Sequence, residues 1–331
     1  MIESTEANAF NLTGDGETIA IIDTGVDAGH PFFGGRVVNE ACFSENWNCP
    51  GPPDLPTCAA LPSLGDNWVP AGSCPSIAAF RSGAAQPCTF APISCEHGTH
   101  VAGIAAGSNG FFNGASFSGV APGASIVSTN VYSDENDPNC AVPSESADCP
   151  KAHEGDMLAA LEYVYDTKSS FDYAAVNMSL GLGVFGPPNC DANFPDFKLI
   201  IYKLRLAGIA TVASSGNQGN KNGLSMPACI SWAVSVGASD KSDNVTIYSN
   251  SAPNLDLLAP GGTGVSAAQQ VTSSIPVYAG SWGGMQGTSM AAPHVAGAYA
   301  LMREEDPQAT VGGIQNMLKA TGVPLVDPET P

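Results

Sequence analysis

Short β-rich runs alternate regularly with segments of helical pattern along this sequence, and this alternation limits the class of fold that it can adopt. Such alternation is typical of the α/β class, in which a mostly parallel central sheet is covered by helices on both faces to give three α/β/α layers. The expected strands are 18–23, 124–132, 173–180, 209–215, 233–239 and 255–260. The expected helices are 97–107, 156–168, 197–208, 289–304 and 311–320.

Three of these segments place a reactive side chain at an element boundary. Asp23 ends the run "TIAIID", while His97 and Ser289 each open a helical segment. Taken singly, each has an ordinary structural explanation as a turn residue, a residue near a helix start or a helix cap. Together they supply a nucleophile, a base and an orienting carboxylate, because a serine hydroxyl needs a histidine base and that base needs a carboxylate partner.

The order of these groups along the chain and the residues around them narrow the choice of hydrolase. The order is Asp, His, Ser, and the serine lies in "GTSMA" rather than in a G-x-S-x-G elbow. The stretches "IAIIDTGVDAGHP" (19–31), "HGTHVAGIAAG" (97–107) and "GTSMAAPHVAG" (287–297) resemble the three catalytic blocks of the subtilisin-like serine proteases, the subtilases. The resemblance covers roughly residues 15–320 and is greatest to secreted bacterial subtilases.

This resemblance implies a subtilisin-like fold and a serine endopeptidase with Asp23, His97 and Ser289 as its triad. Within "SSGNQG" (214–219), it gives Asn217 the role of oxyanion donor, and a neutral amide suits that role because it adds no competing acid or base. The backbone N–H of Ser289, at a helix start, is the expected second donor. The family also implies protein or peptide substrates, a monomer, a prosegment as inhibitor and folding aid, and no cofactor for the chemistry.

Two further stretches resemble the walls of the pocket for the substrate residue before the scissile bond. They are "MSLG" (178–181) and "ASSG" (213–216), whose glycines leave backbone open for pairing with an extended peptide. Neither wall contains an acid, which favours apolar substrate side chains over a dibasic motif. The expected contact residues are Ser179, Leu180, Gly181, Ser214, Ser215 and Gly216.

The helix that Ser289 opens contains a proline, Pro293, where a backbone donor is normally required. The carbonyl of Ser289 therefore lacks its usual intrahelical partner.

Two functions other than peptide hydrolysis remain open. A non-catalytic binding module would normally lack one of the four catalytic groups. A transpeptidase or macrocyclase on the same triad would need a lid that excludes water.

The ten cysteines indicate disulfides and an oxidising, extracellular location, because they lie in proline-rich loops and form no C-x-x-C pair. Proximity favours the bridges Cys140–Cys149 and Cys88–Cys95, and Cys190–Cys229 is expected just beyond the two walls. The Cys- and Pro-rich stretch of about 42–95 is predicted to be an insertion within one catalytic domain, 1–324. Residues 325–331 are predicted to be a linker or a cut tail.

The charge balance is strongly acidic, with 11 Lys and Arg against 31 Asp and Glu, and a formal net charge of −20. Such a chain is expected to repel nucleic acid and anionic membranes. No apolar run reaches the 18 or so residues of a membrane span. The acidic start lacks the features of a signal peptide, so either the protein is cytosolic or a leader has been removed, and the ten cysteines favour removal. The resemblance implies a prosegment that this sequence lacks, so we expect a mature or trimmed catalytic domain. Structural calcium is possible, but Phe32 and Phe33 occupy a turn where the family often has an acid, and the metal ligands remain unknown.

Overall fold

Seven strands form the central sheet of the protein in a computed structural model, which describes residues 12–43, 84–87, 95–136, 148–264, 266 and 268–327. Every neighbouring pair of strands in this sheet is parallel. The spatial order is β13 (Leu257–Pro260), β12 (Val234–Ser239), β10 (Ala210–Ser214), β8 (Tyr173–Met178), β1 (Thr18–Asp23), β5 (Ser125–Asn130) and β2 (Val37–Cys42). The predicted sheet is confirmed, with β2 as an additional edge strand that the sequence pattern did not indicate.

The central strand β1 shows why both faces of the sheet are covered. All six of its residues are buried, and successive side chains of a strand point to opposite faces. Ile19 and Ile21 belong to one apolar cluster, whereas Ala20 and Ile22 belong to the other. A continuous apolar run of this kind is typical of a parallel strand between two helical layers.

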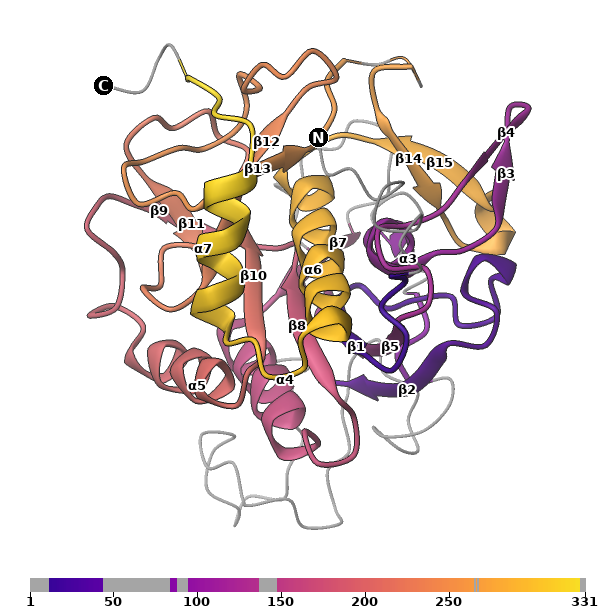
Figure 1. The fold of residues 1–331 in the computed structure, drawn as a ribbon, viewed down its shortest axis with the longest axis horizontal. Coiled ribbons are helices and arrows are strands. Elements are labelled where there is room, and N and C mark those ends of the chain that lie inside the picture. Colours follow the sequence, from indigo (N-terminus) through magenta and orange to yellow (C-terminus); the bar gives the residue numbers. More distant parts are fainter. Residues whose placement is uncertain are drawn as a thin grey trace.

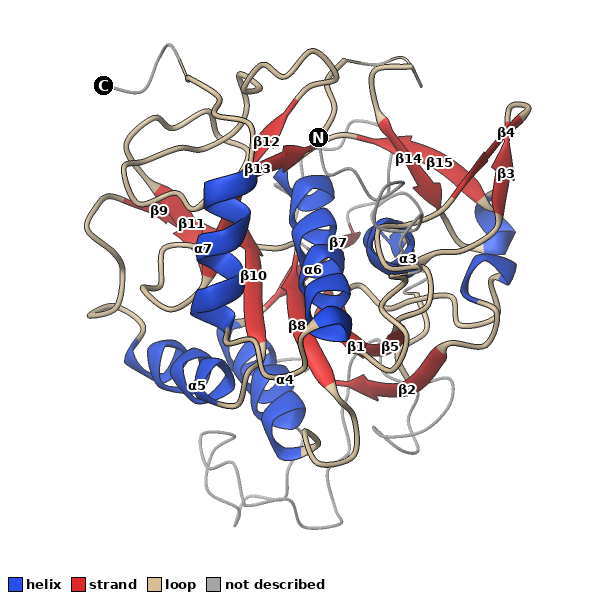
Figure 2. Ribbon diagram, in the orientation of Figure 1, coloured by secondary structure: helices blue, strands red, loops and turns tan. Residues whose placement is uncertain are grey.

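Five α-helices of the described residues form those two layers (Figure 2). The cluster that contains Ile19 is built with α3 (His97–Ala106), α6 (Thr288–Glu305) and α7 (Val311–Thr321), and Figure 1 shows α6 and α7 crossing the sheet on the same side. The opposite cluster is built with α4 (Glu154–Asp166) and α5 (Pro195–Leu206). The expected three-layer arrangement is therefore confirmed.

Four short antiparallel ribbons surround this frame, and the sequence pattern indicated none of them. Strands of three to five residues are too short for an alternating pattern to stand out. The ribbons pair β3 (Gly110–Phe112) with β4 (Ala115–Phe117), β6 (Tyr132–Asn136) with β7 (Asp148–Ala152), β9 (Leu182–Phe185) with β11 (Leu224–Met226), and β14 (Val271–Ser274) with β15 (Trp282–Met285). Short 3₁₀ turns lie at Pro31–Phe33 and Val277–Ala279.

The carboxyl ends of β1, β8 and β10 share one edge of the sheet because the three strands are parallel neighbours. β8 ends at Met178 rather than at 180, so Ser179 and Leu180 lie in the loop that follows it. Most of the predicted insertion of about 42–95 lies outside the described residues. No helix in the described part of the chain has the length and apolar character needed to cross a membrane.

Candidate active site

The first two predicted groups, Asp23 and His97, are in direct contact. Asp23 ends β1 with no exposed surface, and His97 is the first residue of α3. The distance from His97 Nδ1 to Asp23 Oδ1 is 2.8 Å. The same oxygen accepts from the backbone N–H of Thr24 at 2.7 Å. A carboxylate accepts only, so the Nδ1 atom carries the proton and donates, which leaves Nε2 of a neutral ring as the base.

The turn after β1 holds the start of α3 close to the sheet. The Thr24 hydroxyl accepts from the backbone N–H of Gly98 at 2.9 Å, which gives one of the free donors at the helix start a partner. A Cβ atom on Gly98 would lie 2.2 Å from the carbonyl oxygen of Gly25, so only glycine permits this approach. Gly25 itself has φ of +95°, a left-handed conformation that favours glycine. The "DTG" and "HG" sequences therefore fix where His97 begins its helix.

Opposing effects act on the pKa of His97. Burial of the ring lowers it, but the negative charge of Asp23 and the hydrogen bond between them outweigh burial, and the pKa is raised above 6.5. The side chain of His97 remains 24% exposed, so substrate can reach it. His100 behaves differently, because burial and then the neighbouring His97 lower its pKa to about 3. His100 donates from Nε2 to the carbonyls of Val271 and Gly283, so it joins α3 to the β14–β15 ribbon.

Ser289 is the second residue of α6, where the N–H groups have no intrahelical acceptor. Its own N–H has no hydrogen-bond partner among the described residues, and the positive end of the helix dipole lies there. Its hydroxyl donates to the carbonyl of Ser179 at 3.1 Å rather than to His97. In return, the hydroxyl of Ser179 donates at 2.6 Å to the Ser289 carbonyl, the group that Pro293 leaves without an intrahelical donor.

The side chain of Asn217 is oriented by the residue before Ser289. Its Oδ1 atom accepts from the backbone N–H of Thr288 at 2.9 Å and from the Thr288 hydroxyl at 3.0 Å. Because a backbone N–H can only donate, the accepting atom must be the amide oxygen, which settles the orientation of the amide. The Nδ2 donors of Asn217 are thus left for another acceptor beside the start of α6.

The two wall segments, 178–181 and 213–216, lie next to each other. The hydroxyl of Ser214 donates to the carbonyl of Leu180 at 3.4 Å. Ser179, Ser214 and Ser215 are buried, whereas Gly181 is exposed and Gly216 half-buried. The serine side chains therefore hold the walls from within, and an extended peptide has access chiefly to the glycines.

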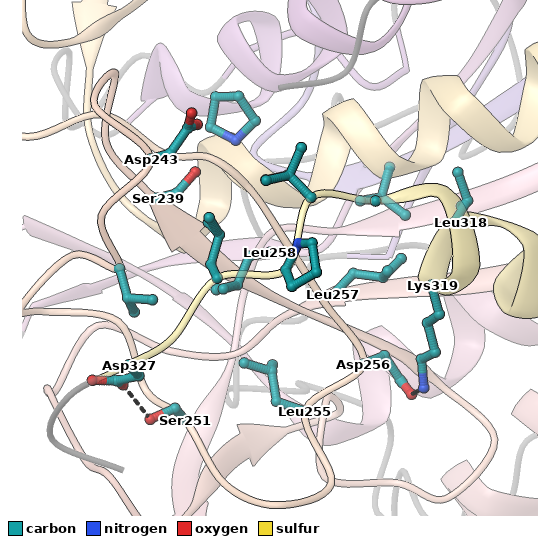
Figure 3. Close-up of a pocket in the computed structure, with 18 of the residues that line it drawn as sticks. Ser239, Asp243, Ser251, Leu255, Asp256, Leu257, Leu258, Leu318, Lys319 and Asp327 are labelled. Atoms are coloured by element: carbon teal, nitrogen blue, oxygen red, sulfur yellow. Dashed lines mark hydrogen bonds and ion pairs between the residues drawn. The ribbon is translucent and has the colours of Figure 1, made fainter.

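A cavity of about 700 Å³ adjoins the first wall. Its lining combines apolar groups from the wall and α4 with the charged residues Lys151 of β7 and Glu154 at the start of α4. The lining residues are Tyr132, Lys151, Ala152, His153, Glu154, Gly155, Met157, Leu180, Gly181 and Leu182. Sequence reasoning missed this contribution, because residues 132–157 showed no link to the wall along the chain. A second cavity of about 790 Å³ lies beside the edge strand β13 and residues 322–327, and none of the predicted site residues lines it (Figure 3).

One of the three predicted disulfides is confirmed. Cys190 and Cys229 are bonded, with their Cα atoms 5.4 Å apart and both side chains buried. The bridge joins the segments that follow β9 and β11, beyond the walls. For the other two predicted bridges, Cys88 and Cys140 lie outside the described residues.

Within the described ranges, no group of three or more His, Cys, Asp and Glu side chains is placed to hold a metal ion. The turn in which calcium was considered carries Phe32 and Phe33, and both side chains are buried in the core. The nearby Asp27 uses its carboxylate on the backbone N–H groups of Gly29 and Val277. These residues offer no oxygen-rich ligand set for calcium.

Comparison with protein families matches this chain to the subtilase family over residues 14–329. Subtilisin E of Bacillus subtilis (strain 168) is 26% identical over 327 residues, which are 98% of this chain and 65% of that protein. Subtilisin BL of Lederbergia lenta is 32% identical over 229 residues, which are 69% of this chain and 71% of that protein. The chain thus spans 65% of the length of subtilisin E.

Solved structures show the same architecture. A cold-adapted subtilisin-like serine proteinase superposes with a TM-score of 0.61 at 25% identity, covering 94% of this chain and 83% of that one. A protease from Pseudoalteromonas arctica superposes with a TM-score of 0.68 at 24% identity, covering 97% of this chain and 90% of that one. The second likeness supports the fold alone.

Proposed function

Because the chain belongs to the subtilase family, we propose that it is a serine endopeptidase that hydrolyses peptide bonds through an acyl-enzyme on Ser289. The observation that carries this proposal is the 2.8 Å hydrogen bond between His97 Nδ1 and the fully buried Asp23 carboxylate. That bond leaves Nε2 as the base at the edge of the sheet where Ser289, the second residue of α6, contacts Ser179 just after β8. The match to the family over residues 14–329 supports the same conclusion.

In the proposed reaction, the hydroxyl of Ser289 leaves the Ser179 carbonyl and turns toward Nε2 of His97. As Ser289 Oγ attacks the substrate carbonyl carbon, His97 takes its proton, and Asp23 stabilises the imidazolium without itself being protonated. His97 then gives the proton to the leaving amine, and the peptide C–N bond breaks. Water attacks the resulting ester with His97 again as base, which releases the acid and restores Ser289.

The charge that develops on the substrate oxygen is proposed to be held by two donors. They are the unpartnered N–H of Ser289 and the Nδ2 group of Asn217, whose Oδ1 is already held by Thr288. These donors are fixed before the reaction, so they need no reorganisation in the transition state. Such a site lowers the barrier more than it strengthens substrate binding.

The substrate is proposed to be an unfolded or extended protein segment with apolar side chains before the cut. The absence of an acid in the wall segments 178–181 and 213–216 supports this preference, as do Tyr132, Met157 and Leu182 in the adjoining cavity. We also propose that the enzyme acts outside the cell as a monomer. The Cys190–Cys229 bridge supports that location, because disulfides persist in oxidising compartments.

Hydrolysis of casein by purified Ser289→Ala, His97→Ala and double variants tests the proposal. Each single change should remove nearly all turnover, and the double variant should be little worse, because the members of a triad act as a unit. Losses that multiply would contradict the triad. Product masses complete the test, since hydrolysis adds one water and a cyclised product, without added water, would indicate a macrocyclase.

A further inference from the structure

The loop that follows β10 carries Asn217 and has little packing of its own. Asn217, Gln218 and Asn220 are all exposed, and the loop turns through Gly216 and Gly219, both with positive φ. Among the described residues, the side chain of Asn217 makes hydrogen bonds only through Oδ1, to the backbone N–H and the hydroxyl of Thr288. The direction of its amide therefore depends on what fixes the backbone on either side of it.

The side chain of Asn250 fixes that backbone on both sides. Asn250 is fully buried, and its Oδ1 atom accepts from the backbone N–H of Gln218 at 3.1 Å and from that of Asn220 at 2.9 Å. Its Nδ2 group donates to the carbonyl of Ser215 at 3.1 Å and to Oε1 of Gln218 at 2.7 Å. One amide thus spans Asn217, from Ser215 before it to Asn220 after it.

The backbone of Asn250 adds two more links to the same loop. Its N–H donates to the carbonyl of Gly216 at 2.9 Å, and its carbonyl accepts from the hydroxyl of Ser215 at 2.9 Å. The contact is also sterically close, because a Cβ atom on Gly216 would lie 2.3 Å from Asn250 Nδ2. Gly216 has φ of +106°, so both its conformation and its lack of a side chain serve this contact.

We propose that Asn250 is a positioning residue for the oxyanion donor Asn217. Asn250 fixes the backbone at residues 215–220, and Thr288 fixes the amide oxygen, so that together they hold Asn217 Nδ2 beside the N–H of Ser289. Asn250 acts through Asn217 and does not reach the substrate. This inference rests on the proposed peptidase function, because it assigns a task within that mechanism.

Removing the Asn250 amide should therefore weaken transition-state binding more than substrate binding. In Asn250→Ala, kcat on a chromogenic peptide amide should fall roughly tenfold to hundredfold with KM nearly unchanged. The upper bound is the loss expected on removing the oxyanion donor itself, on the order of 10²–10³ in kcat. The deciding comparison is made in Asn217→Leu, where the further change Asn250→Ala should leave kcat unaltered.

Two further variants separate positioning from general loss of stability. Gln218→Leu removes one acceptor of the Asn250 amide from an exposed position, so it should fold and lower kcat by a few-fold. Tyr299→Phe is the matched control, since it removes a buried hydrogen bond to the Val311 carbonyl on the helical layer and should lower the melting temperature without changing kcat. A Tyr299→Phe variant with the same kcat loss as Asn250→Ala would overturn the inference.

Other outcomes distinguish failure of the positioning role of Asn250 from failure of the proposed peptidase function. Equal kcat in wild type and Asn250→Ala, a defect in KM alone, or an effect of Asn250→Ala that persists undiminished in Asn217→Leu would each overturn the role of Asn250. The peptidase function would survive any of them, provided that the wild-type protein still cleaves the peptide and Ser289→Ala does not. If the wild type fails to cleave any peptide, the proposed function fails first.

Discussion

Ser179 and Ser289 hold each other through two reciprocal hydrogen bonds: the hydroxyl of Ser179 donates to the Ser289 carbonyl at 2.6 Å, and the hydroxyl of Ser289 donates to the Ser179 carbonyl at 3.1 Å. The first bond supplies the donor that Pro293 cannot provide. Asn177 Nδ2 in turn donates to Ser179 Oγ at 2.9 Å, which sets the direction of the Ser179 hydroxyl. Pro293 is therefore tolerated within α6 because Ser179, a residue of the pocket wall, donates a hydrogen bond to the Ser289 carbonyl.

Replacing Ser179 by alanine should leave this carbonyl without a partner in a half-buried position. We expect Ser179→Ala to lower the free energy of unfolding by about 1–3 kcal/mol, the usual effect of an unsatisfied buried polar group. Adding Pro293→Ala restores a backbone N–H one turn after Ser289 and should recover much of that loss. Urea unfolding of the two variants measures both effects. A double variant that is less stable than Ser179→Ala would show that the carbonyl does not need this donor.

The activity should depend on the protonation of His97. Because Asp23 raises the pKa of His97 above 6.5 despite burial, kcat/KM should rise with pH through a value above 6.5. Asp23→Asn should shift this pKa downward and reduce kcat on the order of 10⁴-fold, the scale seen when a triad loses its carboxylate. A profile that is flat between pH 6 and 9 would contradict His97 as the base.

The raised pKa of His97 also makes the stability of the folded protein depend on pH, and this contribution falls as pH rises, whereas activity increases. A group whose pKa is raised in the folded state stabilises that state most below its unfolded pKa, here about 6.5. The contribution is lost as pH rises through the folded pKa of His97. Comparing wild type with His97→Gln by thermal unfolding across this pH window should therefore show the wild type losing its advantage as activity appears. An advantage that grows with pH would have the wrong sign.

The Cys190–Cys229 bridge closes a loop of 39 residues in sequence, and it should stabilise the folded chain by about 2–4 kcal/mol. Cys190→Ser combined with Cys229→Ser should show this loss in denaturant unfolding. The kcat of the folded variant at low temperature should be unchanged, since the bridge lies beyond the wall segments. Thiol titration of the unfolded, unreduced wild type should find neither cysteine free, and labelling of either would contradict the bridge.

Cleavage profiling with a peptide library tests the expected substrate preference. Peptides with apolar or aromatic residues before the scissile bond should be cut fastest, because neither wall segment offers an acid to pair with a basic side chain. A strict requirement for Arg or Lys at that position would show that an acidic group outside 178–181 and 213–216 forms the pocket floor.

The sequence alone predicted the frame of the fold because most strands of the parallel sheet are rich in apolar residues and alternate along the chain with segments of helical pattern. Likewise, the turn "DTG" and the helix start at His97 place Asp23 and His97 at boundaries that a parallel sheet brings to one edge. Asn250 was missed for a physical reason. Its role depends on its burial against a loop from another part of the chain, and "YSNSA" has no local pattern that indicates such a contact.

The reciprocal hydrogen bonds between Ser179 and Ser289 could not be predicted from the sequence either. Pro293 showed that the Ser289 carbonyl lacked a donor, but the identity of the donor follows only from the packing of α6 against the end of β8. The Cys190–Cys229 pairing was predictable because both cysteines follow the two wall segments along the chain. The charged side of the 700 Å³ cavity was not, because residues 151–154 reach the wall only through the β6–β7 ribbon.

Labelling with a fluorophosphonate, followed by peptide mapping, is the decisive test of Ser289 as the nucleophile. The reagent reacts with a serine hydroxyl that a neighbouring base activates, so we expect a single modified peptide that contains Ser289. Ser289→Ala should not be labelled, and His97→Ala should be labelled far more slowly. Modification of a different serine, or a wild-type protein that remains unlabelled under conditions in which it is folded, would contradict Ser289 as the nucleophile.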